Sequence, residues 1–358
     1  MKQKKVYVTL QNGDVFQGYR FGAEGEIAGE MIFSTGMVGY VETLTDPSNY
    51  GKIVVQTFPL IGNYGVARVD AESEQTWVSA YIVREKCDIP SNFRSEESLE
   101  SYMKEQGVIG VYGIDTRQLT KILRENGEMN AYISNRPLKN VEDKLADYSA
   151  KDAVKAVAPK QAQTFGDKAE YTVALWNFGA KKSTIESLIS RGCQVISMPA
   201  DSTAEEILAT GANGVVIADG PGNPADNTQA IEEMKKLLGK KPVLGIGLGH
   251  QMIALALGAK TARQKYGHHG GNQPVKHVDS GKVYISTQNH SYTVLPETVK
   301  EGKVSFVGVN DSSCEGIEYT NLNALGVQFA PETCVAGTSE NIVYNTFFAW
   351  MRKEKENA

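Results

Sequence analysis

The chain has 358 residues, of which 41% are hydrophobic and 22% are charged, and its formal net charge is -5. This length exceeds one ordinary domain and is sufficient for two domains, each with a sizeable core. A mildly acidic chain without a dense run of Lys and Arg argues against nucleic acid or an anionic membrane as a partner. No apolar stretch approaches the roughly 20 residues that a membrane span needs.

The N-terminal basic residues precede only a short apolar run, residues 6–10, so we expect no signal peptide. The cysteines are widely spaced and form no CxxC pair: Cys87, Cys193, Cys314 and Cys334. This spacing suits a reduced protein better than a disulfide framework or a zinc site. The sequence therefore predicts a cytoplasmic protein.

Residues 1–135 are rich in Gly, Tyr and β-branched residues, which predicts a β-rich N-terminal domain. An Asn12-Gly13 pair between two alternating runs predicts a β-hairpin. Further strands are expected at 53–58 and 77–83. Helices are expected at 96–106 and 115–126, the second of them capped by Asp115 or Thr116.

Residues 136–169 are rich in Lys, Asp and Ala and predict a connector with one marginal helix. From residue 170 to the C-terminus, strands and helices alternate, which predicts an α/β domain with a doubly wound, mostly parallel sheet. Capping boxes are expected for two of its helices, Ser183 with Glu186 and Ser202 with Glu205. Such sheets bind ligands beyond the carboxyl ends of their strands, here the loops 219–224 and 246–251.

Three short segments fall at these predicted strand ends: ADGPGNP at 218–224, GIGLGHQ at 245–251 and QFAPE at 328–332. Their order resembles a class I glutamine amidotransferase domain, whose middle motif is G-x-Cys-x-G-x-Q and whose last motif carries His-x-Glu. The physical design is a nucleophile elbow, a sharp strained turn between a strand and a helix. The N–H of Leu248 and the backbone of 220–222 are the candidate donors to an oxyanion there.

Further segments resemble the small subunit of carbamoyl-phosphate synthases rather than other amidotransferases: 35–65, 113–127, 267–275 and 288–294. The resemblance covers nearly the whole chain and implies a β-rich domain joined to an amidotransferase domain. It implies that a cysteine attacks the side-chain amide of glutamine, a histidine acts as the base and a glutamate orients the histidine. The released ammonia would pass through a tunnel to a large partner subunit. No cofactor is expected in this chain, because that partner would bind the ATP and Mg used to make carbamoyl phosphate for arginine and pyrimidine synthesis.

The chain departs from this family pattern at the catalytic positions. Gly247 stands at the nucleophile position and Ala330 at the base position, while the orienting Glu332 is retained. Glycine cannot form a thioester and alanine cannot carry a proton. We therefore expect that the chain does not hydrolyse glutamine. The altered residues 333–337 favour natural drift over engineered inactivation.

Residues that match the family's glutamine-binding positions are mostly present: Ser48, Gly220, Gly222, Leu248, Gln251, Asn289, Ser291 and Tyr292. Ser291 replaces the usual glycine, which puts backbone recognition there in doubt. Inheritance of the family fold, without any binding of glutamine, explains the presence of these residues equally well.

The histidines near these motifs carry no predicted catalytic role. We expect structural hydrogen-bonding roles for His250 and His290. His268 and His269 are adjacent, but neighbouring side chains diverge and no carboxylate partner is evident, so no metal site is expected.

Three functional hypotheses remain open at this point. The first is a subunit of an ammonia-dependent carbamoyl-phosphate synthase, retained for assembly, tunnel closure or activation of the large subunit. The second is a regulatory or glutamine-sensing pseudoenzyme that modulates the same kind of ATP-dependent partner. The third is a working glutaminase that uses an unmatched nucleophile such as Cys334.

Overall fold

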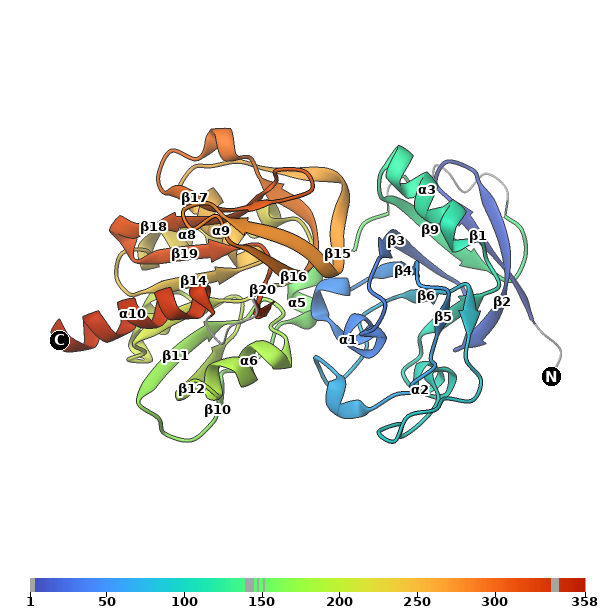
Figure 1. Ribbon diagram of the computed structural model, residues 1–358, viewed down its shortest axis with the longest axis horizontal. Helices are drawn as coiled ribbons and strands as arrows, with labels where there is room; N and C mark the ends of the chain where they lie inside the picture. Colours follow the sequence, from blue (N-terminus) through green and yellow to red (C-terminus); the bar gives the residue numbers. More distant parts are fainter. Residues whose placement is uncertain (1–3, 139–144, 147, 151, 336–340, 358) are drawn as a thin grey trace. The chain divides into compact units, whose positions relative to one another are not determined.

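The structure, a computed structural model, describes residues 4–138, 145–146, 148–150, 152–335 and 341–357 (Figure 1). Contacts divide the chain into two compact units, Met1–Ala153 with Lys265–Gly270, and Val154–Gln264 with Gly271–Ala358. The expected domain ranges 1–135, 136–169 and 170–358 stay a prediction.

The first unit is built on a closed barrel, in which the strands follow the order β1-β2-β8-β6-β4-β3-β9. Alternate residues of these strands face an apolar interior that includes Val8, Ile53 and Val111, as expected for strands with one buried face. Its elements are β1 (Lys5–Leu10), β2 (Val15–Gly22), β3 (Ile27–Ser34), α1 (Tyr40–Thr45), η1 (Pro47–Asn49), β4 (Lys52–Gln56), β5 (Leu60–Ile61), η2 (Arg68–Asp70), β6 (Ala80–Ile82), β7 (Glu85–Lys86), α2 (Leu99–Glu105), β8 (Ile109–Tyr112), α3 (Thr116–Asn126) and β9 (Met129–Ser134).

Local sequence signals account for two parts of this unit. The predicted hairpin is confirmed, because β1 pairs antiparallel with β2 and Gly13 adopts the positive φ, 90°, that the turn requires. The predicted cap of α3 is also confirmed, since the Asp115 side chain accepts a hydrogen bond from the N–H of Gln118. Leu119 and Leu123 of α3 are fully buried against the barrel core.

The second unit contains a sheet with the strand order β10-β12-β11-β13-β14-β19-β18-β17-β15-β16-β20. Its elements are α5 (Ala153–Val157), β10 (Gln163–Phe165), β11 (Tyr171–Trp176), α6 (Lys182–Ile189), β12 (Cys193–Met198), α7 (Ala204–Ala209), β13 (Gly214–Ile217), η3 (Pro224–Asp226), α8 (Thr228–Leu237), β14 (Val243–Ile246), α9 (Leu248–Ala256), β15 (Thr261–His277), β16 (Val283–Val294), η4 (Pro296–Thr298), β17 (Lys303–Gly308), β18 (Cys314–Tyr319), η5 (Thr320–Leu322), β19 (Ala324–Val327), β20 (Ala330–Val335) and α10 (Ile342–Asn357).

The expected doubly wound α/β architecture is confirmed in this sheet. Strands β12, β11, β13, β14 and β19 pair in parallel, and the strand order reverses at β11. Trp176 packs with α8 and α9 on one face, whereas Leu175 packs with α6 and α10 on the other. Figure 1 shows α10 in front of the sheet and α8 and α9 behind it. The carboxyl ends of these strands are therefore the expected place for a ligand site.

Two details of the second unit differ from the sequence predictions. Both predicted capping boxes are wrong: α6 begins after Lys181 without a side-chain cap, and the box of α7 uses Thr203 and Glu206 instead. The pattern S-T-A-E-E offers two registers that differ by one residue, and spacing alone cannot choose between them. Strands β15 and β16 are also longer than the short strands expected after residue 270.

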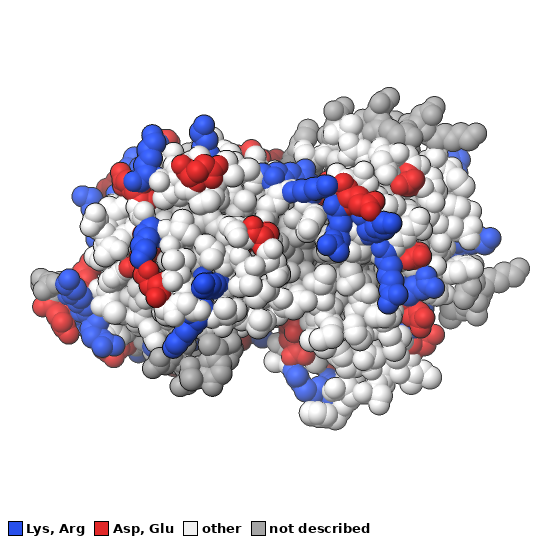
Figure 2. All heavy atoms as spheres, turned by 45° about the horizontal axis from the view of Figure 1, so that its top comes forward, with Lys and Arg blue, Asp and Glu red and all other residues white. Residues whose placement is uncertain are grey.

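Basic and acidic side chains are interspersed over the face of the molecule that Figure 2 shows. This mixture agrees with a formal net charge of only -5. Among the residues that the structure describes, no helix has both the length and the hydropathy to cross a bilayer.

Candidate functional site

The turn between β14 and α9 retains the backbone of a nucleophile elbow. Gly247 occupies it with φ 52° and ψ -110°, a conformation that is strained for any residue with a side chain. Its N–H donates to the carbonyl oxygen of Val327 at 2.9 Å, which joins the end of β14 to β19. The sharp bend therefore persists at a position that has no nucleophile.

The loops that follow β11 and β13 pack against this elbow. A Cβ added to Gly220 would lie 2.5 Å from the carbonyl oxygen of Phe178 and 3.0 Å from the Leu248 side chain. Only glycine fits where backbones approach this closely. Gly222, two residues later, has a φ of 94° and turns the loop back. The structure thus brings together Gly220, Gly247 and Leu248 from three predicted motif positions.

The Asp219 carboxylate lies at the centre of this cluster. Its Oδ1 accepts the N–H of Leu248 at 2.9 Å and the N–H of Gly220 at 2.8 Å. These are two of the donors that the sequence predicted for an oxyanion. A Cβ added to Gly247 would fall closer than 3.0 Å to Asp219 Cγ, Oδ1 and Oδ2. Asp219 was not among the predicted site residues, although it is the only acidic residue of the ADGPGNP motif and directly follows a predicted strand.

Glu332 is retained but does not lie beside a histidine in its motif, because Ala330 carries no ring. Its Oε1 accepts from the Thr184 hydroxyl at 3.0 Å and from the Ser183 hydroxyl at 3.4 Å. The Lys181 ammonium lies 3.3 Å from the same oxygen, and the two side chains are only 9% and 7% exposed. The start of α6 therefore supplies the hydrogen bonds and the positive charge that stabilise this buried carboxylate. Sequence reasoning did not identify Lys181 or Thr184.

Of the predicted glutamine-binding residues on α9 and β16, Gln251 forms hydrogen bonds within the second unit. The buried amide nitrogen of Gln251 donates to the Tyr292 carbonyl oxygen at 2.7 Å and to Gln328 Oε1 at 2.9 Å. Ser291 is buried, and its hydroxyl has no hydrogen-bond partner within the described part of the chain. Asn289 is half-buried on β16. Binding of glutamine by these residues stays a prediction.

Ser48 lies in the first unit, whereas the other predicted binding residues lie in the second. It is buried in η1, and its N–H donates to the Asp46 carboxylate at 2.9 Å. Its contribution to a common pocket also stays a prediction.

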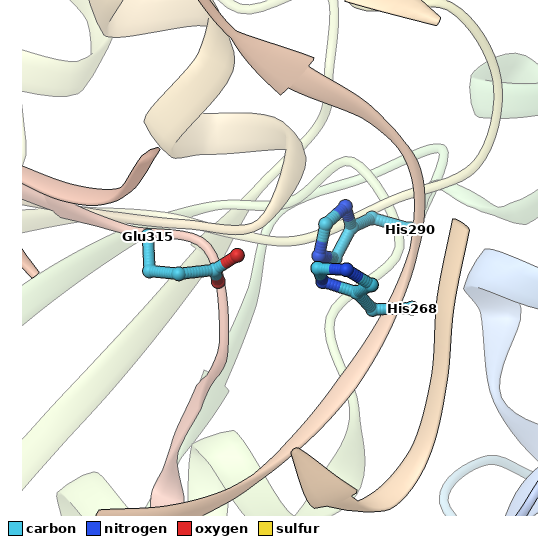
Figure 3. Close-up of side chains that lie close together, drawn as sticks. All are labelled: His268, His290 and Glu315. Carbon is cyan, nitrogen blue, oxygen red and sulfur yellow. The ribbon is translucent and has the colours of Figure 1, made fainter. Parts of the chain in front are cut away.

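The structural role expected for His290 is confirmed, but the described part of the chain provides no hydrogen bond to the His250 ring. His290 Nδ1 lies 2.8 Å from the Tyr292 carbonyl oxygen, and its Nε2 lies 3.1 Å from Gln288 Oε1. Figure 3 shows the His290 ring directed toward the Glu315 carboxylate of β18. A ring nitrogen of His290 and a carboxylate oxygen of Glu315 lie within 4.8 Å of each other. His268, also drawn in Figure 3, belongs to the first unit. Burial lowers the pKa of His250 to about 3, and neither ring nitrogen has a partner within the described residues.

Glu128 of the first unit is a carboxylate partner of His269, one of the two adjacent histidines. The sequence did not predict this pair. His269 Nε2 lies 2.8 Å from Glu128 Oε1, which also accepts the N–H of Gly267 at 2.7 Å. Burial alone would raise the pKa of Glu128, but the hydrogen bond and charge of His269, the charge of Lys52 and the Gly267 N–H outweigh it and lower the pKa to about 2. His269 therefore has a structural partner in the barrel unit.

The two cysteines described in the second unit outside β20, Cys193 and Cys314, offer no activated thiol. Burial raises the pKa of both Cys193 and Cys314 to about 12, so both remain protonated at neutral pH. The side chain of Cys334 lies outside the described residues, and so do residues 336 and 337 of the altered segment 333–337.

Comparisons with known proteins give a family match for each of the two units. Residues 8–133 match the family described as carbamoyl-phosphate synthase small chain, CPSase domain, and residues 174–350 match glutamine amidotransferase class-I. The chain is 44% identical to a carbamoyl phosphate synthase small chain of Clostridium perfringens, over 97% of this chain and 99% of the relative. It is 40% identical to a pyrimidine-specific small chain of Halalkalibacterium halodurans, over 99% of both chains. The solved structure of a glutamine amidotransferase from Thermotoga maritima covers 52% of this chain and 82% of its own, at 21% identity and a TM-score of 0.34.

Proposed function

Because this chain belongs to the family of carbamoyl-phosphate synthase small chains, we propose that it is the small subunit of a synthase that uses free ammonia. It binds a large, ATP- and Mg-dependent partner subunit in the cytoplasm and does not supply that partner with nitrogen from glutamine. The chain itself needs no cofactor for this role. The carbamoyl phosphate would serve arginine or pyrimidine synthesis, and the pyrimidine-specific description of one relative supports the second pathway.

The observation that carries this proposal is the state of the elbow. At Gly247 the backbone bend of a nucleophile is retained, but the space for a side chain is filled by the Asp219 carboxylate. Gly247 offers no thiolate to attack the amide of glutamine, and Ala330 offers no base. Loss of one member of a catalytic unit already removes most of its rate enhancement.

The other hypotheses receive less support. Rescue by Cys193 or Cys314 is disfavoured because burial raises the pKa of both thiols to about 12. A glutamine-sensing role would use Gln251, whose amide nitrogen already has two internal acceptors. We keep glutamine sensing as the second candidate, tested by calorimetric titration of the complex with glutamine.

The proposal is tested with the purified complex of this chain and its large partner subunit. We expect carbamoyl phosphate from bicarbonate, ATP and ammonium chloride, and only background product when glutamine replaces ammonium. Glutamine labelled with ¹⁵N at its side-chain amide should therefore leave the product unlabelled. An assay of the large partner alone with ammonium measures what the small chain adds to the reaction.

Product labelled from amide-¹⁵N glutamine, obtained with protein free of contaminating glutaminase, would disprove the proposal. Failure of the two chains to co-purify would remove the assembly role as well.

A further inference from the structure

The Asp219 carboxylate has a geometry that the missing catalytic residues do not explain. Loss of a cysteine and a histidine would leave an empty elbow with free N–H groups. Instead, the Leu248 and Gly220 N–H groups both donate to Asp219 Oδ1, at 2.9 and 2.8 Å. An anionic acceptor at a helix N-terminus is stabilised by both the N–H groups and the helix dipole.

The same carboxylate also takes the space of a nucleophile. A Cβ on Gly247 would come closer than 3.0 Å to three atoms of the Asp219 side chain, a separation that real Cβ atoms essentially never show. A cysteine there would place a sulfur atom beside a negative charge, and such a neighbour disfavours the thiolate. The Asp219 carboxylate thus both accepts the N–H groups and fills the space that a side chain at position 247 would need.

We propose that Asp219 is a built-in occupant of the oxyanion site, which closes this pocket to the carbonyl oxygen of glutamine independently of the changes at Gly247 and Ala330. A neutral amide oxygen competes poorly for two N–H groups that already bind a carboxylate, because charge-assisted hydrogen bonds are about twice as strong as neutral ones. This inference rests on the proposed function, since it concerns the same pocket. It adds a third position that must change before the pocket can work.

The test starts from the variant Gly247→Cys with Ala330→His, which restores both missing groups. Alkylation of the introduced thiol by iodoacetamide is measured with Asp219 present, with Asp219→Asn and with Asp219→Ala. Asparagine keeps the size of the side chain and removes its charge, whereas alanine removes both. The matched control is Asp201→Ala, which removes the same charge from an exposed position outside the pocket.

We expect alkylation at neutral pH to become at least about tenfold faster with Asp219→Ala, because the freed N–H groups then lower the pKa of the thiol. Asp219→Asn should give an intermediate rate and Asp201→Ala no change. Glutamine hydrolysis should rise at least about 100-fold with Asp219→Ala, the effect typical of one restored oxyanion donor. Equal alkylation rates in all Asp219 backgrounds would overturn the proposal, whether or not glutamine is hydrolysed.

A second measurement leaves Gly247 unchanged, in case the introduced cysteine prevents folding. Asp219→Ala in the otherwise native chain should increase hydrogen exchange of the Leu248 amide at least about tenfold, because its acceptor is removed. Unchanged exchange would contradict the proposal. Neither result affects the proposed function, which is tested separately by nitrogen transfer from glutamine and by co-purification of the native complex.

Discussion

Glu128→Ala should lower the free energy of unfolding of the first unit by about 1–3 kcal/mol, the cost of leaving buried polar groups without their hydrogen-bond partner. The side chains of Glu128 and His269 are only 1% and 3% exposed. The substitution leaves His269 buried without its carboxylate and also removes the acceptor of the Gly267 N–H. Unmatched buried polar groups of this kind are the main cause of the loss.

The same pair predicts how the stability of this unit depends on pH. The pKa of Glu128 is about 2 in the folded chain, below its ordinary value of 4.5, so the folded state favours the ionised form. Its contribution is therefore fully present above about pH 4.5 and is lost as the pH falls toward about 2. Glu128→Gln should remove this part of the acid dependence.

Denaturant unfolding followed by hydrogen exchange of peptides from β9 and from 265–270 measures the first unit separately from the second. The matched control is Glu125→Ala, because Glu125 forms an exposed pair with Lys121 at 3.8 Å, with side chains 62% and 74% exposed. The control should leave the midpoint unchanged, since solvent screens such pairs. Equal midpoints for the Glu128 and Glu125 variants would show that the buried pair contributes nothing.

Lys181→Met is the second substitution with a large expected effect, about 3–5 kcal/mol on the free energy of unfolding of the second unit. It leaves the Glu332 carboxylate, 7% exposed, without the ammonium that lies 3.3 Å away. The hydroxyl of Thr184 remains as a hydrogen-bond donor but carries no charge. The other carboxylate oxygen of Glu332 has no hydrogen-bond partner in the described part of the chain.

The double variant Lys181→Met with Glu332→Gln separates the charge of the pair from its packing. We expect it to recover most of the stability, because replacing both members of a buried pair by neutral groups is often neutral. Lys182→Met is the control, since Lys182 pairs with Glu186 at 3.5 Å in solvent and contributes about 1 kcal/mol or less. If the double variant is less stable than Lys181→Met, the two residues do not act as a pair. Denaturant unfolding followed by hydrogen exchange of peptides from β11 and α6 measures the stability of each variant.

The sequence predicted the parts of the fold that local signals determine. The Asn12-Gly13 turn, the Asp115 cap and the regular alternation after residue 170 each depend on neighbours a few residues apart. The elbow was also predictable, because its glycines follow a strand and precede a helix. These features identified the second unit as an α/β amidotransferase fold.

The contacts that decide the chemistry of the site were not predictable in the same way. Asp219 contacts Leu248, which lies 29 positions later in the chain. Lys181 contacts Glu332, and these two residues lie near opposite ends of the sequence of the second unit. A motif match compares residues one position at a time. It does not reveal that the Asp219 side chain fills the space beside Gly247. The retained Glu332 illustrates this limit, because its presence in the motif indicated an orienting role, whereas its contacts are with the start of α6.

Strand β15 has one consequence for the molecule as a whole. Its middle, Lys265–Gly270, belongs to the first unit, while the residues on both sides belong to the second. The two units are thus interlaced along the polypeptide, and no single cleavage divides the chain into one fragment for each. A fragment that ends at residue 153 would lack His269 and would present the Glu128 carboxylate without its partner. Any graft of the barrel onto another protein must therefore carry a second, short piece of chain with it.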